Sequence, residues 1–184
     1  KKRDGRLRDR PLRLILGEEP IMRHFVEDLE TLKTKLLEMG SLVESAIQRS
    51  ISAVTQKDRS AAEQVFMNEA RINAIEIEID DFAISLLALQ QPMAADLRLI
   101  VAALKINTDL ERMGDLSVHI AQRALSLLTE PVIKPMVDIR HMSALVESMV
   151  RKSMDAFVAN DADMARSVLA SDDAVDSLRT ASYH

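Results

Sequence analysis

The chain has 184 residues, enough for one domain or two small ones, and its 47% hydrophobic and 29% charged residues are the proportions of a folded protein. Cysteine is absent, which excludes disulfides, thiolate metal sites and a cysteine nucleophile. The net charge of −5 argues against nucleic acid as the main partner, and no apolar run approaches the roughly 18 residues that span a bilayer, so we expect no membrane insertion.

Basic residues crowd the first thirteen positions, where only Asp4 and Asp9 oppose them. Such a segment can be an arm that touches acidic lipid or nucleic acid, or a disordered extension ahead of the fold. The pattern of a folded helix begins only near His24. We therefore expect residues 1–21 to be a basic, disordered extension.

From Phe25 onward, apolar residues recur at alternating spacings of three and four for about eight turns, which is typical of a long helix in a left-handed bundle. The residues expected on its buried face are Phe25, Leu29, Leu32, Leu36, Met39, Val43, Ile47, Ile51 and Val54. The pattern breaks before Asp58 and Ser60, either of which can cap a second helix, and Pro92 suits the first turn of a third. Residues 130–135 form the clearest linker in the chain. The expected helices cover 24–57, 60–90 and 92–128, with no strand.

The sequence after the linker repeats the sequence before it. With a shift of 103 residues, Leu42–Ser45 matches Leu145–Ser148 without a gap, and paired apolar positions continue to Ile75 and Leu178. So long a match indicates an internal duplication of a three-helix unit, with further helices over 137–159 and 162–178. The match ends at Arg179, so the second unit is expected to be truncated and marginally stable. The expected domains are an extension over 1–21, a first bundle over 22–130 and a partial second repeat over 131–184.

Two pairs of carboxylates interrupt apolar stretches of the second and third helices. Glu76 and Asp80 lie four residues apart, as do Glu111 and Asp115, and apolar residues border both pairs. On a helical wheel Glu111 and Asp115 have no obvious solvated side, because the opposite face is apolar and their own face also carries Leu97, Ile100, Val101, Leu104 and Val118. Unpaired carboxylates in such positions require a cation or a proton, so we expect the four to converge on a metal ion. Hard cations or iron suit oxygen ligands of this kind, and His119, one turn beyond, is a candidate nitrogen ligand.

Other readings of these residues remain open. Arg98 or Arg112 can pair with the carboxylates and give a metal-free structural network, and His141 is expected to lie at the surface. The Glu-x-x-His pairs of di-iron bundles, the His-Glu-x-x-His motif, a glycine-rich phosphate loop and the Gly-x-Ser-x-Gly motif are all missing. We therefore expect no enzymatic activity.

Three segments resemble the motifs of the PhoU family. They are residues 109–115 with Ile120 and Ala121 after them, Pro92 followed by 95–99, and the run 72–80. The resemblance covers about residues 24 to 178 and implies an all-α fold of two tandem three-helix bundles, the second incomplete here.

The resemblance also implies a metal site, because Glu-x-x-x-Asp motifs bind clusters of iron or other metals in some members of the family. Carried over by position, the ligands of the first bundle would be Glu76, Asp80, Glu111 and Asp115, for iron, zinc, manganese or magnesium. Arg179 stands where the second repeat would need its first acid.

The function that the resemblance implies is negative regulation of phosphate uptake and of the phosphate regulon. Such proteins are cytoplasmic, often homodimeric, and act between the nucleotide-binding subunit of the phosphate ABC transporter and a phosphate-sensing histidine kinase. Two alternatives come from other classes, a helical metal-binding or storage module without a signalling partner and a metal-free helical scaffold.

Overall fold

A computed structural model describes residues 18–90, 92–131 and 138–181, and within these ranges the protein is helical without a strand. The predicted all-α fold is therefore confirmed, with boundaries within a few residues of those expected except that the first helix begins earlier, at Glu18. Residues 1–17 of the expected extension and most of the expected linker lie outside the described residues. The helices are α1 (Glu18–Gln56), α2 (Arg59–Gln90), α3 (Ala94–Ser126), α4 (Ile139–Ala159) and α5 (Ala162–Ala181).

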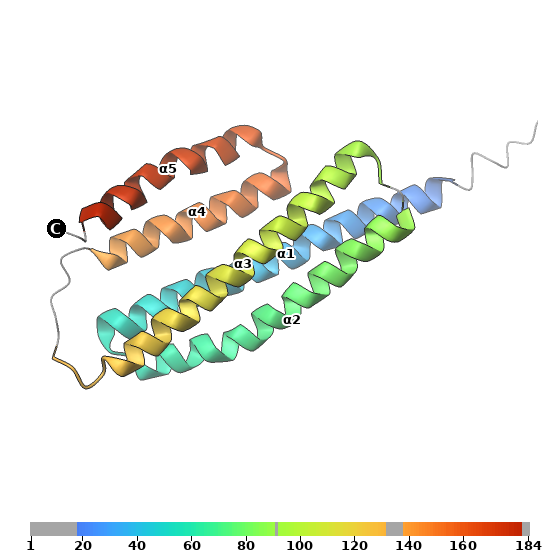
Figure 1. The fold of residues 1–184 in the computed structure, drawn as a ribbon. Coiled ribbons are helices and arrows are strands. Elements are labelled where there is room, and N and C mark those ends of the chain that lie inside the picture. The colour runs from blue at the N-terminus through green and yellow to red at the C-terminus, as the bar shows by residue number, and fades with distance from the viewer. Residues whose placement is uncertain (1–17, 91, 132–137, 182–184) are drawn as a thin grey trace, which may run out of the picture.

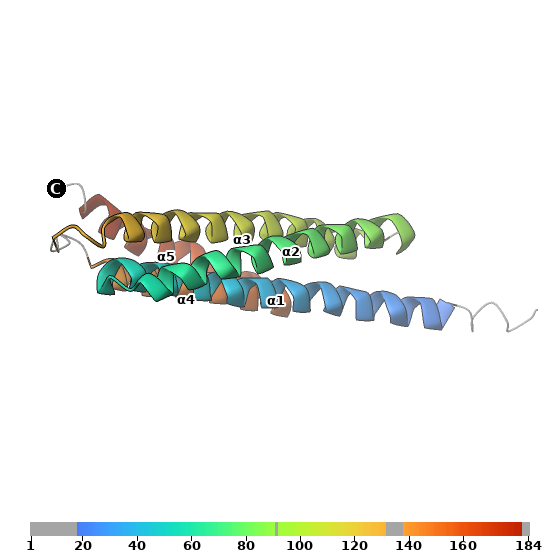
Figure 2. The ribbon, with the colours of Figure 1, turned by 90° about the horizontal axis from the view of Figure 1, so that it is seen from below.

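The first three helices pack against one another along their lengths and form an elongated three-helix bundle (Figure 1). Helix α4 lies beside α1, and α5 packs on α4, away from α2 (Figures 1 and 2). The core belongs mainly to the first bundle, since Val168 is the single buried residue of α5. The two helices of the second repeat thus pack against the first bundle through the contact of α4 with α1.

The buried positions of α1 keep a strict heptad rhythm over their whole length. Leu32, Leu36 and Met39 are fully buried, as the sequence predicted. Beyond Val43 the predicted face is wrong, because the core positions are taken by smaller residues, while their larger neighbours are half-buried. In a heptad repeat the same line of positions faces the partner helices along the whole helix. Small residues at these positions are therefore buried even where larger apolar residues lie beside them. The core residues there are Ala46, Ser50 and Ala53 instead of Ile47, Ile51 and Val54.

A second stripe of α1 faces α4. A Cβ atom on Gly40 would approach Cγ of Met154 to 3.2 Å, so glycine permits the close approach of the two helices. One turn later, Glu44 accepts a hydrogen bond of 2.6 Å from Nη2 of Arg151. Ile47 and Ile51 follow on this stripe and are half-buried, because α1 packs against α4 as well as against α2 and α3.

The turns between the paired helices are built alike, as an internal duplication predicts. Lys57 has a φ of 54° and Asn160, 103 positions later, has a φ of 53°. The next residue caps the following helix in both cases, since Asp58 and Asp161 each accept a hydrogen bond from the backbone N–H three residues ahead, at 3.1 and 2.9 Å. The two repeats therefore use the same left-handed residue and the same N-cap.

Helix α3 departs from the sequence prediction near its start. Pro92 precedes the helix, whose N-cap is Met93. Leu97 and Val101, which the helical wheel placed on the apolar face, are 43% and 40% exposed. The buried seam instead passes through Ile100, and it continues at alternating spacings of three and four to Ala124. This rotation of α3 sets which polar residues face α2.

Candidate functional site

The four predicted carboxylates lie where α2 and α3 pack side by side (Figure 1). All four are half-buried, although the helical wheel had left the pair on α3 without a solvated side. Gly114 lies between the two acids of α3 and is buried against α2, where a Cβ atom would approach Cδ1 of Ile72 to 3.2 Å. The glycine therefore lets the helices approach closely at the level of the acids, Glu76, Asp80, Glu111 and Asp115.

Asn107 joins the two helices at this interface. It is fully buried, and its Nδ2 atom donates to Oδ1 of Asp80 at 2.9 Å and to the backbone carbonyl of Glu76 at 3.0 Å. Its Oδ1 atom is buried without a hydrogen-bond partner. The sequence analysis missed this residue. The signal was available, because Asn107 occupies a core position in the heptad rhythm of α3 and stands one turn before Glu111.

The carboxyl of Glu111 has a raised pKa at this interface. Desolvation by burial raises the pKa of the Glu111 carboxyl above its ordinary value, and the nearby negative charges of Asp115 and Glu76 raise it further. Arg112 acts in the opposite direction but does not outweigh these causes. Glu111 on α3 therefore lies near a carboxylate of its own helix, Asp115, and one of α2, Glu76.

This raised pKa predicts a pH dependence of stability. The folded state binds the Glu111 proton more tightly than the unfolded chain, so this group makes the free energy of unfolding fall as pH rises from about 4.5 through the raised pKa. Glu111→Gln is neutral in both states and should melt at a higher temperature than the wild type at pH 7 in chelator, with a flatter pH profile. Glu63→Gln removes a charge from an exposed site of α2 and serves as the matched control. Identical pH profiles for the wild type and Glu111→Gln would contradict the assignment.

The residue types at the α2–α3 interface suit a hard cation, but their arrangement in the structure does not. Carboxylate oxygens and the unpartnered Oδ1 of Asn107 are ligands of the type that such ions prefer. Among the described residues, however, no three His, Cys, Asp or Glu side chains are arranged so as to hold a metal ion. The candidate nitrogen ligand, His119, is exposed and lines a separate hollow with Gln122 and Arg123. Metal binding at this interface would therefore require its side chains to change rotamer.

The arginines that could have neutralised the acids do not pair with them. Arg98 and Arg112 are both exposed, and within the described ranges neither forms an ion pair with a carboxylate of the α2–α3 interface. His141 is at the surface as predicted, and its backbone N–H donates to Asp138, the N-cap of α4. The arginine-paired network of the metal-free reading is thus missing from this part of the molecule.

Taken with the fold, these features define a class of protein, a helical-repeat bundle with an acidic seam between its second and third helices. The PhoU domain family matches residues 36–124 and 139–183, well over half of the chain. The chain belongs to the PhoU family.

Two relatives illustrate the match, and both bear the name phosphate-specific transport system accessory protein PhoU homolog. The relative from Aquifex aeolicus is 40% identical over 158 residues, which are 86% of this chain and 70% of that protein. The relative from Pseudomonas aeruginosa is 39% identical over 157 residues, 85% of this chain and 65% of its own length. A third relative, from Pseudomonas putida, is covered over only 61% of its length, so this chain spans about two thirds of such proteins.

Solved structures give the same result. The crystal structure of PhoU from Pseudomonas aeruginosa superimposes with a TM-score of 0.82 at 38% identity, covering 86% of this chain and 77% of that one. The phosphate transport system regulatory protein PhoU from Streptococcus pneumoniae gives a TM-score of 0.78 at 29% identity, covering 86% and 74%. None of the helices in the described part of the chain carries an apolar stretch sufficient to cross a membrane.

Proposed function

We propose that this protein is a non-catalytic negative regulator of phosphate uptake and of the phosphate regulon. It acts in the cytoplasm as an adaptor between the nucleotide-binding subunit of the phosphate ABC transporter and a phosphate-sensing histidine kinase, and it assembles as a homodimer. The observation that carries the proposal is membership of a family whose curated relatives are named accessory proteins of phosphate-specific transport.

An exposed apolar patch at the turn between α2 and α3 supports the adaptor role. Leu89 is 78% exposed at the end of α2, and Met93 is 77% exposed at the N-cap of α3. Leu97 and Val101 follow at intervals of one turn and are also exposed. Exposed apolar side chains gathered in one place on a helical surface are typical of a protein-binding site. We therefore assign the patch Leu89, Met93, Leu97 and Val101 to partner contact.

The patch provides a direct test of the proposal. The purified chain is expected to capture the transporter's nucleotide-binding subunit or the kinase from detergent-solubilised membranes of phosphate-replete cells. The double variant Met93→Asp with Leu97→Asp should reduce capture about tenfold or more, as expected for apolar residues at the centre of an interface. Aspartate is a favourable N-cap residue, so the substitution at Met93 should leave α3 formed.

Met67→Asp is the matched control, because Met67 is 75% exposed near the start of α2, at the other end of that helix from the patch. This variant should capture partners as the wild type does. Recovery of neither partner by the wild-type chain would count against the adaptor role, and equal loss in both variants would count against the patch.

A second candidate function, metal binding or storage, is favoured by the α2–α3 interface itself. Burial, and then the charges of Asp115 and Glu76, raise the pKa of the Glu111 carboxyl, and a cation would relieve the repulsion between these charges. Glu76, Asp80, Glu111 and Asp115 would supply the oxygens, with Asn107 beside them. Bound iron, zinc, manganese or magnesium would act as a fixed positive charge that ties α2 to α3.

A further inference from the structure

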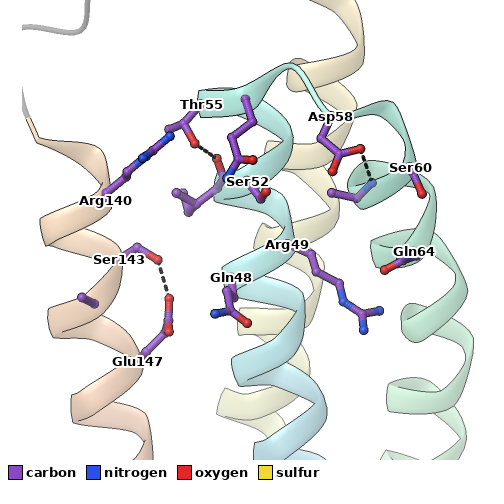
Figure 3. Close-up of a pocket in the computed structure, with 14 residues that line it drawn as sticks. Gln48, Arg49, Ser52, Thr55, Asp58, Ser60, Gln64, Arg140, Ser143 and Glu147 are labelled. Carbon is purple, nitrogen blue, oxygen red and sulfur yellow. Dashed lines mark hydrogen bonds between the residues drawn. The ribbon is translucent and has the colours of Figure 1, made fainter.

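A polar groove of about 520 Å³ crosses the C-terminal half of α1 on the side where α2 and α4 flank it (Figure 3). It lies at the opposite end of α2 from the apolar patch, and its lining does not include the acids of the α2–α3 interface. Hydroxyl and amide side chains supply half of the lining residues, with Gln48, Ser52 and Thr55 on α1. The regulatory role and the metal site use none of these residues.

The two carboxylates of the groove are already engaged in hydrogen bonds. Asp58 caps α2 by accepting from the backbone N–H of Ala61 at 3.1 Å. Glu147 accepts from the hydroxyl of Ser143 at 2.7 Å. Both acids therefore have a structural partner, and part of their capacity to accept hydrogen bonds is used within the protein.

The two arginines of the groove, in contrast, have no such partner. Arg49 on α1 and Arg140 on α4 form no ion pair with any described residue. Arg71 and Arg151, which lie elsewhere on the same bundle, pair with Glu38 and Glu44. The groove thus presents unpaired guanidinium donors beside carboxylates that are hydrogen-bonded, which favours a ligand rich in acceptors and negative charge.

The directions of the arginines restrict the shape of this ligand. Arg140 extends from α4 toward Thr55 near the end of α1, whereas Arg49 extends from α1 toward α2 on the side of Gln64 (Figure 3). The two guanidinium groups therefore lie on different sides of α1, and Gln48 and Ser52 lie on the helix between them. A ligand that meets both arginines must be elongated and carry at least two anionic groups.

We propose that the polar groove binds a short chain of linked phosphate groups, either inorganic or attached to a nucleoside. Guanidinium groups recognise phosphate oxygens in a forked geometry, and neutral amides and hydroxyls can bridge the oxygens between them. The volume of the groove accommodates such a chain and exceeds what a single phosphate ion would occupy. The net charge of −5 gives the protein, outside the basic residues of the first thirteen positions, no general attraction for polyanions, so a dependence of binding on these two arginines identifies the groove as the site.

Calorimetric titration of the full chain, without divalent cations and at low ionic strength, tests the proposal. Inorganic tripolyphosphate and ATP should both bind saturably, and orthophosphate should bind at least about tenfold more weakly because it reaches one arginine only. Equal affinities for tripolyphosphate and ATP would identify the phosphate chain alone as the ligand, and tighter binding of ATP would identify a nucleotide.

The test is made specific by variants that remove a positive charge from the groove and by one that removes a negative charge. Arg49→Gln and Arg140→Gln should each raise the dissociation constant by about three- to tenfold, as for partly exposed charged contacts. Glu147→Gln removes a negative charge that opposes the ligand and should lower it. Arg98→Gln, an exposed arginine at the opposite end of the bundle, is the matched control and should leave binding unchanged.

The proposal is overturned if neither tripolyphosphate nor ATP binds saturably. It is equally overturned if Arg98→Gln weakens binding as much as Arg49→Gln and Arg140→Gln do, because the attraction would then be non-specific. Circular dichroism of each variant establishes that the helices are formed before binding is compared. The experiment uses no transporter or kinase, so its outcome is independent of the regulatory role.

Discussion

Replacing Leu36 with alanine is expected to destabilise the protein by about 2–5 kcal/mol, which corresponds to a fall in melting temperature of roughly 5–15 °C for a chain of this size. Leu36 is fully buried in the seam of α1. Truncation removes apolar surface from the core and leaves a cavity that neighbouring long helices cannot close without bending. The loss is a large share of the stability of an ordinary domain.

The adjacent residue provides the control for this prediction. Leu37 lies on the same turn of α1 but is 39% exposed. Leu37→Ala therefore removes the same side-chain atoms without opening a cavity in the core. Its cost should stay below about 1 kcal/mol. Urea denaturation followed by circular dichroism measures both variants. Equal losses for Leu36→Ala and Leu37→Ala would mean that the seam of α1 is not where the structure places it.

Metal binding should produce the second large effect. At a metal concentration of 100 times the dissociation constant, an ion bound only to the folded state adds about 2.7 kcal/mol to the free energy of unfolding. Iron, zinc, manganese or magnesium should therefore raise the melting temperature of the wild type above its value in chelator. The gain should disappear in the double variant Glu111→Gln with Asp115→Asn, although circular dichroism should show its helices formed.

The same double variant should be more stable than the wild type in chelator, because it removes the burial cost of the charged Glu111 carboxyl and its repulsion by Asp115, which together raise the pKa of Glu111. If the double variant is not stabilised by metal and is more stable than the wild type in chelator, its substituted residues act as metal ligands. General damage to the fold would instead lower its stability in chelator. Glu63→Gln with Asp109→Asn removes two charges from exposed sites of α2 and α3 and should keep the metal response. If wild-type melting is the same with each metal as with chelator, the metal proposal fails.

Much of the fold could be predicted from local chemistry. The spacing of apolar residues located the first three helices of the described residues, because a helix that packs along its length must repeat its buried positions every three or four residues. The 103-residue shift located the last two helices. In the structure the same shift relates the left-handed Lys57 to Asn160 and the capping residue Asp58 to Asp161.

The candidate site could be predicted only in part. The spacing of the acids correctly placed carboxylates of α2 and α3 at one interface, but Asn107 was missed, although it joins the two helices. The heptad rhythm of α3 was the available signal, but Asn107 is a core position only with the rotation of α3 that the structure shows, which differs from the predicted one. The same rotation exposes Leu97 and Val101 and so creates part of the apolar patch.

The sequence by itself thus determined the helices, their turns, the duplication and the family, because each follows from residues that are close together or repeat at fixed intervals. Only the tertiary structure decided which face of each helix is buried, as the core positions Ala46 and Ser50 show. It also brought Arg49 and Arg140 to one groove from distant positions in the chain. Packing makes this decision because each long helix has several half-apolar faces, and only contact with its neighbours selects among them.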